Sequence, residues 1–181
     1  MEKEQIRKSK FLSLILRHDP GKAKINLDAH GWANVDDILK VPLLNIDMEE
    51  LEDIVTDNDK KRFQFNADYS KIRAVQGHSI DVKIEMDDYT PINDLYHGTA
   101  TKYVESIMKY GISKQKRQHV HLSKDYNTAV KVGARHGTPE VVVVDAISML
   151  NDGIQFLQAA NGVILTEYVA PQYLKPVFNS L

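Results

Sequence analysis

Near the start of the chain, apolar side chains recur three or four positions apart. These side chains are Phe11, Leu12, Ile15 and Leu16. The spacing places them on one face of a helix over residues 5–17, and Pro20 ends the segment. Arg17 and His18 therefore stand at the C-terminal end of the predicted helix, where the chain turns.

The rest of the first half reads as two shorter helices followed by two strands. The predicted helices span residues 35–39 and 47–55, and the predicted strands span residues 63–66 and 71–75. Asp47 is expected to cap the third helix, because its carboxylate can accept a hydrogen bond from the first turn. Three helices and a hairpin predict a winged-helix-like lobe over residues 1–90, and residues 81–92 are the expected linker.

The second half alternates short strands with helices. The predicted strands span residues 94–97, 120–123, 141–144, 162–166 and 168–169, and the predicted helices span residues 101–110 and 126–135. At His97-Gly98-Thr99 a strand is expected to turn into a helix, where glycine lets the backbone approach a ligand and free N–H groups face a phosphate. The pattern predicts an α+β fold with a second compact lobe over residues 91–181.

Composition excludes several classes of chemistry. The 181 residues are 43% hydrophobic and 27% charged, which is ordinary for a soluble globular protein. The absence of cysteine excludes disulfides, thiolate metal ligands and cysteine nucleophiles. No apolar run approaches the roughly 18 residues of a membrane span, and the first residues lack a signal peptide's apolar stretch. We therefore expect a cytoplasmic protein with no membrane partner.

The net charge constrains how the chain could bind nucleic acid. A net charge of −2 argues against binding of a phosphate backbone by a broad basic surface. A nucleic-acid substrate would have to be held in a focused pocket, which favours an enzyme acting on one phosphate.

Arginine and histidine gather in three short segments. The segments are residues 16–18, 72–79 and 117–123, and they hold three of the six arginines and four of the seven histidines. Arginine offers a fixed fork of donors suited to phosphate, and histidine adds a donor or a proton carrier. The segments predict a phosphate site, although unrelated surface or capping clusters remain an alternative for each one alone.

Familiar cofactor and nucleophile motifs are missing from the sequence. No GxGxxG, P-loop or GxSxG pattern occurs, so a dinucleotide would have to be held in another way. His119 and His121 alternate on one face of a predicted strand and could form a zinc pair. No third or fourth ligand stands at a suitable spacing, so we expect no metal.

Short motifs occur along nearly the whole chain. They are Leu16-Arg17-His18-x-Pro20, Gly31-Trp32, residues 72–79, residues 95–99, Arg117-x-His119-Val120-His121-Leu122-Ser123, Val132-Gly133-x-Arg135-x-Gly137, residues 144–146 and Asn161-Gly162-Val163-x-Leu165-Thr166. In their order and spacing, these motifs resemble the RNA 2′-phosphotransferase family. The resemblance implies a winged-helix-like N-terminal lobe and a C-terminal lobe of the ADP-ribosyltransferase fold.

The resemblance also implies a reaction that consumes NAD. In this family an internal RNA 2′-phosphate attacks the nicotinamide ribose at C1″ and expels nicotinamide. The ribose O2″ then attacks the phosphate, which releases 2′-OH RNA and ADP-ribose 1″,2″-cyclic phosphate. The expected partners are therefore NAD and RNA bearing an internal 2′-phosphate, and we expect a monomer.

Site residues follow from the matched segments. The family's catalytic arginine–histidine–arginine–arginine set falls on Arg17, His18, Arg73 and Arg117, and His78 joins these four in the expected substrate-phosphate site. The positions expected to bind NAD are His97, Gly98, Thr99, His121 and Ser123.

Two other functions remain open from the sequence. One is an ADP-ribosyltransferase that modifies protein or nucleic-acid ends, for which Arg17, His18 and Arg73 would be superfluous. The other is a winged-helix regulator, which the acidic third helix disfavours because its carboxylates repel a phosphate backbone. Glu167 could be mistaken for the catalytic glutamate of the better-known branch of the ADP-ribosyltransferase fold.

Overall fold

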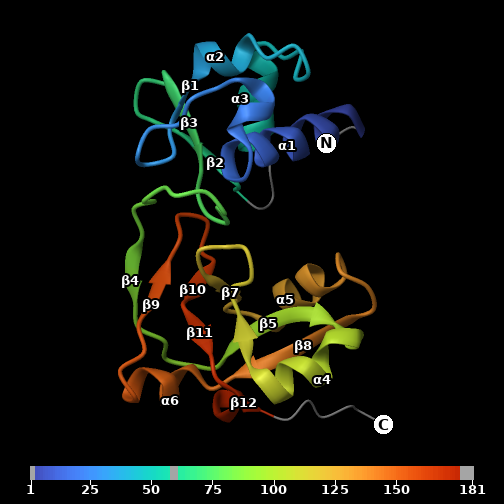
Figure 1. Cartoon of the computed structure of the whole chain (residues 1–181), viewed down its shortest axis with the longest axis vertical. Helices are drawn as coiled ribbons and strands as arrows, with labels where there is room; N and C mark the ends of the chain where they lie inside the picture. Colours follow the sequence, from blue (N-terminus) through green and yellow to red (C-terminus); the bar gives the residue numbers. More distant parts are fainter. Residues whose placement is uncertain (1–2, 58–60, 176–181) are drawn as a thin grey trace. The chain divides into compact units, whose positions relative to one another are not determined.

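The computed structural model describes residues 3–57 and 61–175 and divides the chain into two compact units. Unit 1 is Met1–Glu85 and unit 2 is Met86–Leu181. Both units combine helices with small antiparallel sheets (Figure 1). The predicted mixture of helices and strands is thus confirmed, whereas the winged-helix and ADP-ribosyltransferase assignments of the lobes over residues 1–90 and 91–181 stay predictions.

Unit 1 places three helices against a small sheet. Its elements are α1 (Lys3–Arg17), the 3-10 helix η1 (Pro20–Ala23), β1 (Ala33–Asn34), α2 (Val35–Leu39), α3 (Met48–Thr56), β2 (Phe63–Phe65) and β3 (Lys71–Ala74). The strands are ordered β1-β3-β2, and both pairings are antiparallel. The predicted helices and hairpin of this half are confirmed, including the cap, because the Asp47 carboxylate accepts a hydrogen bond from Glu50 N at 2.9 Å.

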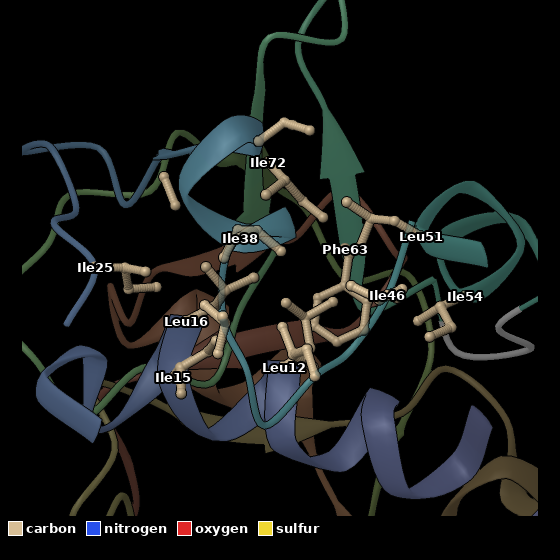
Figure 2. Packing of buried hydrophobic residues seen from close by; sticks show 14 of the residues in the cluster. Leu12, Ile15, Leu16, Ile25, Ile38, Ile46, Leu51, Ile54, Phe63 and Ile72 are labelled. Carbon is tan, nitrogen blue, oxygen red and sulfur yellow. The ribbon is translucent and has the colours of Figure 1, made fainter. Parts of the chain in front are cut away.

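The core of unit 1 forms around the apolar face of α1. Leu12, Ile15 and Leu16 are completely buried. Figure 2 shows them pointing from α1 into a cluster that includes Phe63 of β2 and Ile72 of β3. The buried stripe of α1 ends at Leu16. The next residue, Arg17, is the last of the helix and begins the candidate site.

Unit 2 contains short strands in three sheets with helices between them. Its elements are β4 (Asp87–Tyr89), β5 (Leu95–Ala100), α4 (Thr101–Tyr110), β6 (Ile112–Ser113), β7 (Val120–Leu122), α5 (Tyr126–Gly133), β8 (Pro139–Val144), α6 (Ala146–Asn151), β9 (Phe156–Gln158), β10 (Ile164–Thr166), β11 (Tyr168–Val169), η2 (Pro171–Tyr173) and β12 (Leu174–Lys175). The sheets are ordered β4-β9-β10-β7, β12-β8-β5 and β11-β6.

The predicted linker over residues 81–92 is partly wrong. Asp87–Tyr89 forms β4, which pairs antiparallel with β9 at the edge of its sheet. An edge strand tolerates acidic residues because one side of it faces solvent, so the polar composition that suggested a linker is compatible with a strand. Helix α6 and strand β9 were not predicted, although the Asp145 carboxylate caps α6 by accepting from Ser148 N at 3.1 Å.

The predicted turn at Gly98-Thr99 is also wrong. Strand β5 continues to Ala100, with Gly98 paired to Val141, and α4 begins only at Thr101. A Cβ atom on Gly98 would lie 1.9 Å from the backbone oxygen of Ala129 in α5. Glycine is therefore needed here because the backbone of α5 touches β5, and not because the chain turns.

This close approach predicts the effect of adding one methyl group. Gly98→Ala should destabilise the protein by at least about 1–3 kcal/mol, because the clash is with backbone rather than with a side chain that can rotate away. Gly21→Ala is the control, since its Cβ would meet nothing closer than 3.4 Å. Urea unfolding followed by far-ultraviolet circular dichroism measures both variants, and equal stability of the two would contradict the packing argument.

Candidate active site

In unit 1, the C-terminal end of α1 is tied to the loop that follows β3. Ser79 N donates to the backbone oxygen of Arg17 at 3.0 Å, and the Ser79 hydroxyl lies 2.9 Å from His18 Nδ1. His18 is exposed, whereas the Nε and NH2 atoms of Arg17 are buried. Two of the predicted site residues are thus joined to the segment that carries a third, His78.

Arg73 lies on β3 and is only 5% exposed. The register of the hairpin sets it opposite Gln64 of β2. The side-chain amide of Gln64, with its oxygen turned toward Arg73, accepts from Nε at 2.9 Å and from NH2 at 2.8 Å. The guanidinium carbon lies 4.3 Å from the centre of the Trp32 ring, and NH2 lies 3.7 Å from the Glu85 carboxylate.

The turn before β1 holds Trp32 in place. The Asp28 carboxylate accepts hydrogen bonds from the backbone N–H groups of His30 and Trp32, both at 3.0 Å. Neither Trp32 nor Gln64 was predicted as a site residue. Trp32 did give a signal, as the single tryptophan of the sequence within a matched segment, but Gln64 gave none without the strand register.

His78 lies beside these cations and is almost completely buried, with 1% of its surface exposed. Burial, together with the positive charges of Arg17, His18 and Arg73, lowers the pKa of His78 to about 4. Its Nε2 atom is buried and has no hydrogen-bond partner among the described residues. The structure therefore brings together the four site residues predicted in this unit, and His78 is uncharged among them at neutral pH.

In unit 2, the predicted NAD-binding residues lie on two neighbouring strands. The backbones of Tyr96 in β5 and of Ser123, just beyond β7, exchange hydrogen bonds of 2.9 and 2.8 Å. This bridge sets His97, Gly98 and Thr99 of β5 close to His121 of β7. Thr99 is buried at 5% exposure, and His97 is half-buried.

Hydrogen bonds define the proton positions on both histidines. His97 Nδ1 lies 3.1 Å from the backbone oxygen of His121, which can only accept, so Nδ1 carries a proton. Burial lowers the pKa of His97, which favours the neutral ring and leaves Nε2 as an acceptor. Arg117 NH1 lies 3.0 Å from His121 Nδ1; because a guanidinium only donates, the neutral His121 ring carries its proton on Nε2.

Two further residues, His119 and Glu167, are the alternative candidates for a zinc ligand and for a catalytic glutamate, respectively. Glu167 is an exposed residue that pairs with Lys114. The pKa of His119 is lowered by burial despite the nearby Glu167 carboxylate. Within residues 3–57 and 61–175, no group of three or more His, Asp or Glu side chains is arranged to hold a metal ion. The expectation of a metal-free site stays a prediction.

Comparison with known proteins identifies the family. Residues 3–168 match the family described as RNA 2′-phosphotransferase, Tpt1 / KptA family. The chain belongs to this family. It is 48% identical over 170 residues to a probable RNA 2′-phosphotransferase of Flavobacterium johnsoniae, covering 92% of this chain and 93% of that protein. A protein of the same description from Hahella chejuensis is 45% identical over 177 residues, covering 96% and 95% of the two chains.

Membership establishes the general class of the protein. The resemblance found in the sequence is confirmed, and the chain is a transferase of the RNA 2′-phosphotransferase family. In the described part of the chain, no helix is long and apolar enough to cross a membrane. The cytoplasmic location and the monomeric state stay predictions.

The depressed pKa of His78 predicts how the stability of unit 1 changes with pH. The unfolded chain binds a proton at this histidine near pH 6.5, and the folded chain binds it only near pH 4. Stability should therefore fall as the pH decreases from 6.5 to 4, by about 3 kcal/mol in total, and this contribution should be absent in His78→Gln.

The single tryptophan makes this change measurable in unit 1. Trp32 fluorescence during urea unfolding at a series of pH values reports the stability of wild type and variant. Titration of the His78 ring by NMR supplies a direct check. A ring pKa near 6.5 in the folded protein, or an identical loss of stability in His78→Gln, would contradict the burial argument.

Proposed function

We propose that this protein removes an internal 2′-phosphate from RNA in a reaction that consumes NAD+. The products are 2′-OH RNA, nicotinamide and ADP-ribose 1″,2″-cyclic phosphate. The observation that carries the proposal is that Ser79 ties Arg17 and His18, at the end of α1, to the loop that follows β3, the strand that carries Arg73. Two arginines and an exposed histidine are suited to binding a phosphate, and the family's name supplies the phosphate's position on RNA.

In the first step the 2′-phosphate is the nucleophile. One of its oxygens bonds to C1″ of the nicotinamide ribose as the bond to nicotinamide breaks. Positive charge develops on the ribose, so a phosphate held in line reacts without a strong base. In this proposal Arg17 and Arg73 orient the phosphate, which lowers the entropic cost of the attack.

In the second step the phosphorus is the electrophile. The ribose O2″ bonds to phosphorus, the bond between phosphorus and RNA O2′ breaks, and the proton of the ribose hydroxyl passes to water. Negative charge accumulates on the phosphate oxygens, where the arginine donors stabilise it. His18 is the proposed proton donor to the departing O2′, because it is exposed and its ring is oriented by Ser79. The resemblance also implies that Arg117 is a catalytic residue.

We propose that NAD+ binds unit 2 at His97, Gly98, Thr99, His121 and Ser123. The rings of His97 and His121 present an acceptor and a donor, respectively, as their hydrogen bonds define. Such a pair can bind the hydroxyl groups of a ribose. The close approach of the α5 backbone to Gly98, the residue next to His97, supports a preformed site.

The reaction itself is tested with a synthetic oligonucleotide that carries one internal 2′-phosphate. Loss of the phosphate and release of nicotinamide should occur in equal amounts, only when NAD+ is added, and should persist in EDTA. Arg7→Ala, which changes an exposed arginine of α1 that pairs with Glu4, should retain the activity. Dephosphorylation without NAD+, or activity that EDTA abolishes and zinc or magnesium restores, would overturn the proposal.

The division of labour between the two steps gives a second prediction. Arg17→Ala, His18→Ala and Arg73→Ala should slow the second step by about 100- to 1000-fold, the effect of losing one preorganised donor, and slow the first step less. The ADP-ribosylated RNA should then accumulate. A single-turnover reaction with radiolabelled 2′-phosphate, resolved on a denaturing gel, measures both steps. If the three variants slow only the first step, the cluster binds substrate without assisting the second reaction.

A further inference from the structure

The guanidinium of Arg73 is held by its side rather than by its end. Nε and NH2 form the side of the group, and both donate to the Gln64 amide oxygen at 2.9 and 2.8 Å. Trp32 covers one face, with its ring centre 4.3 Å from the guanidinium carbon. Rotation of the group about its long axis would break the bonds to Gln64 and the contact with Trp32 together.

The donors that remain point in one direction. A guanidinium has five N–H groups, and Gln64 accepts from two of them. NH1 also lies 3.5 Å from the backbone oxygen of His30. One N–H is then left on NH1 and one on NH2, and these two nitrogens form the end of the group, which can bind a phosphate through two parallel hydrogen bonds.

An anion already lies near NH2, one of the two nitrogens of that end. A carboxylate oxygen of Glu85 is 3.7 Å from NH2, and the Glu85 side chain is 77% exposed while that of Arg73 is 6% exposed. The contact is too long for a hydrogen bond, and an ion pair with an exposed glutamate contributes little stability. The buried arginine thus presents its end to a place that a negatively charged group can reach from solvent.

We propose that Gln64 is a positioning residue for Arg73, holding the guanidinium so that its NH1–NH2 end meets the 2′-phosphate of the RNA. The inference rests on the proposed function for the identity of the phosphate. Gln64 touches neither the RNA nor NAD+ in this proposal and acts only through Arg73. The antiparallel register of β2 and β3 supplies the pairing, since it sets the two residues directly opposite each other.

Gln64→Met tests the role because it retains the length of the side chain and removes the acceptor. We expect the second step of the reaction to slow by up to about 100-fold in single-turnover assays, the scale of a misoriented catalytic group. Gln155→Met makes the same chemical change at an exposed position of unit 2 and should react like wild type. A wild-type rate for Gln64→Met would overturn the proposal.

A double-mutant cycle separates positioning from a general structural defect. If Gln64 acts only through Arg73, then Gln64→Met should change the rate by less than about threefold when Arg73 is already alanine. A defect spread through unit 1 would instead slow both backgrounds equally, and that result would contradict the proposal. Trp32 fluorescence during urea unfolding verifies that each variant is folded.

A spectroscopic measurement makes the result independent of the reaction. The Arg73 Nε–H group, assigned by its loss in Arg73→Ala, should give a slowly exchanging signal in a ¹⁵N–¹H correlation spectrum of the wild type. The signal should be lost or exchange rapidly in Gln64→Met. If the signal behaves as expected in both proteins but the wild type is inactive, the proposed function is refuted and the contact between Gln64 and Arg73 is not. If the signal is unchanged in Gln64→Met, only the positioning role is refuted.

Discussion

The constraint on which unit 1 depends is the burial of a permanent charge. Arginine is the permanently charged side chain, yet only 5% of the surface of Arg73 meets solvent. A buried cation is tolerated when it is hydrogen-bonded or paired, and an amide oxygen, an indole face and a backbone carbonyl contact the guanidinium here. Each of these groups comes from a different part of the chain, so the site exists only when the unit has folded.

The pKa of His78 shows that a further positive charge is disfavoured in this environment. Burial, together with the positive charges of Arg17, His18 and Arg73, lowers the pKa of its ring and keeps it neutral. A neutral ring can fill space and orient the loop without repelling the cations that a phosphate would need. The hydrogen bonds of Ser79 to Arg17 and His18 secure the same loop at the end of α1. The helix end, the strand and the loop thus hold one another.

Local patterns were sufficient for much of this fold and failed where partners lie far apart in sequence. The apolar spacing of α1 and the Asp47 cap depend on neighbours within four residues, so the sequence predicted them. Strand β4 was missed because its acidic composition resembles a linker, and only its pairing with β9 reveals it. Gln64 was missed as a partner of Arg73 because the contact requires the hairpin register to the exact residue, and a shift of one residue would move the side chain to the other face.

The contact between β5 and α5 affects how sequence variation at this site should be interpreted. A Cβ atom at Gly98 would meet the backbone of Ala129, and one at Gly133 would lie 2.4 Å from the backbone oxygen of Thr99. Any larger residue at either position would have to displace backbone atoms, so both positions favour glycine for architectural reasons. Their invariance across an alignment of relatives would follow from packing alone and would carry no information about ligand binding. Gly98 is next to His97 in the sequence. Selection for packing at Gly98 and selection for chemistry at His97 therefore act on adjacent codons, and only the second bears on catalysis.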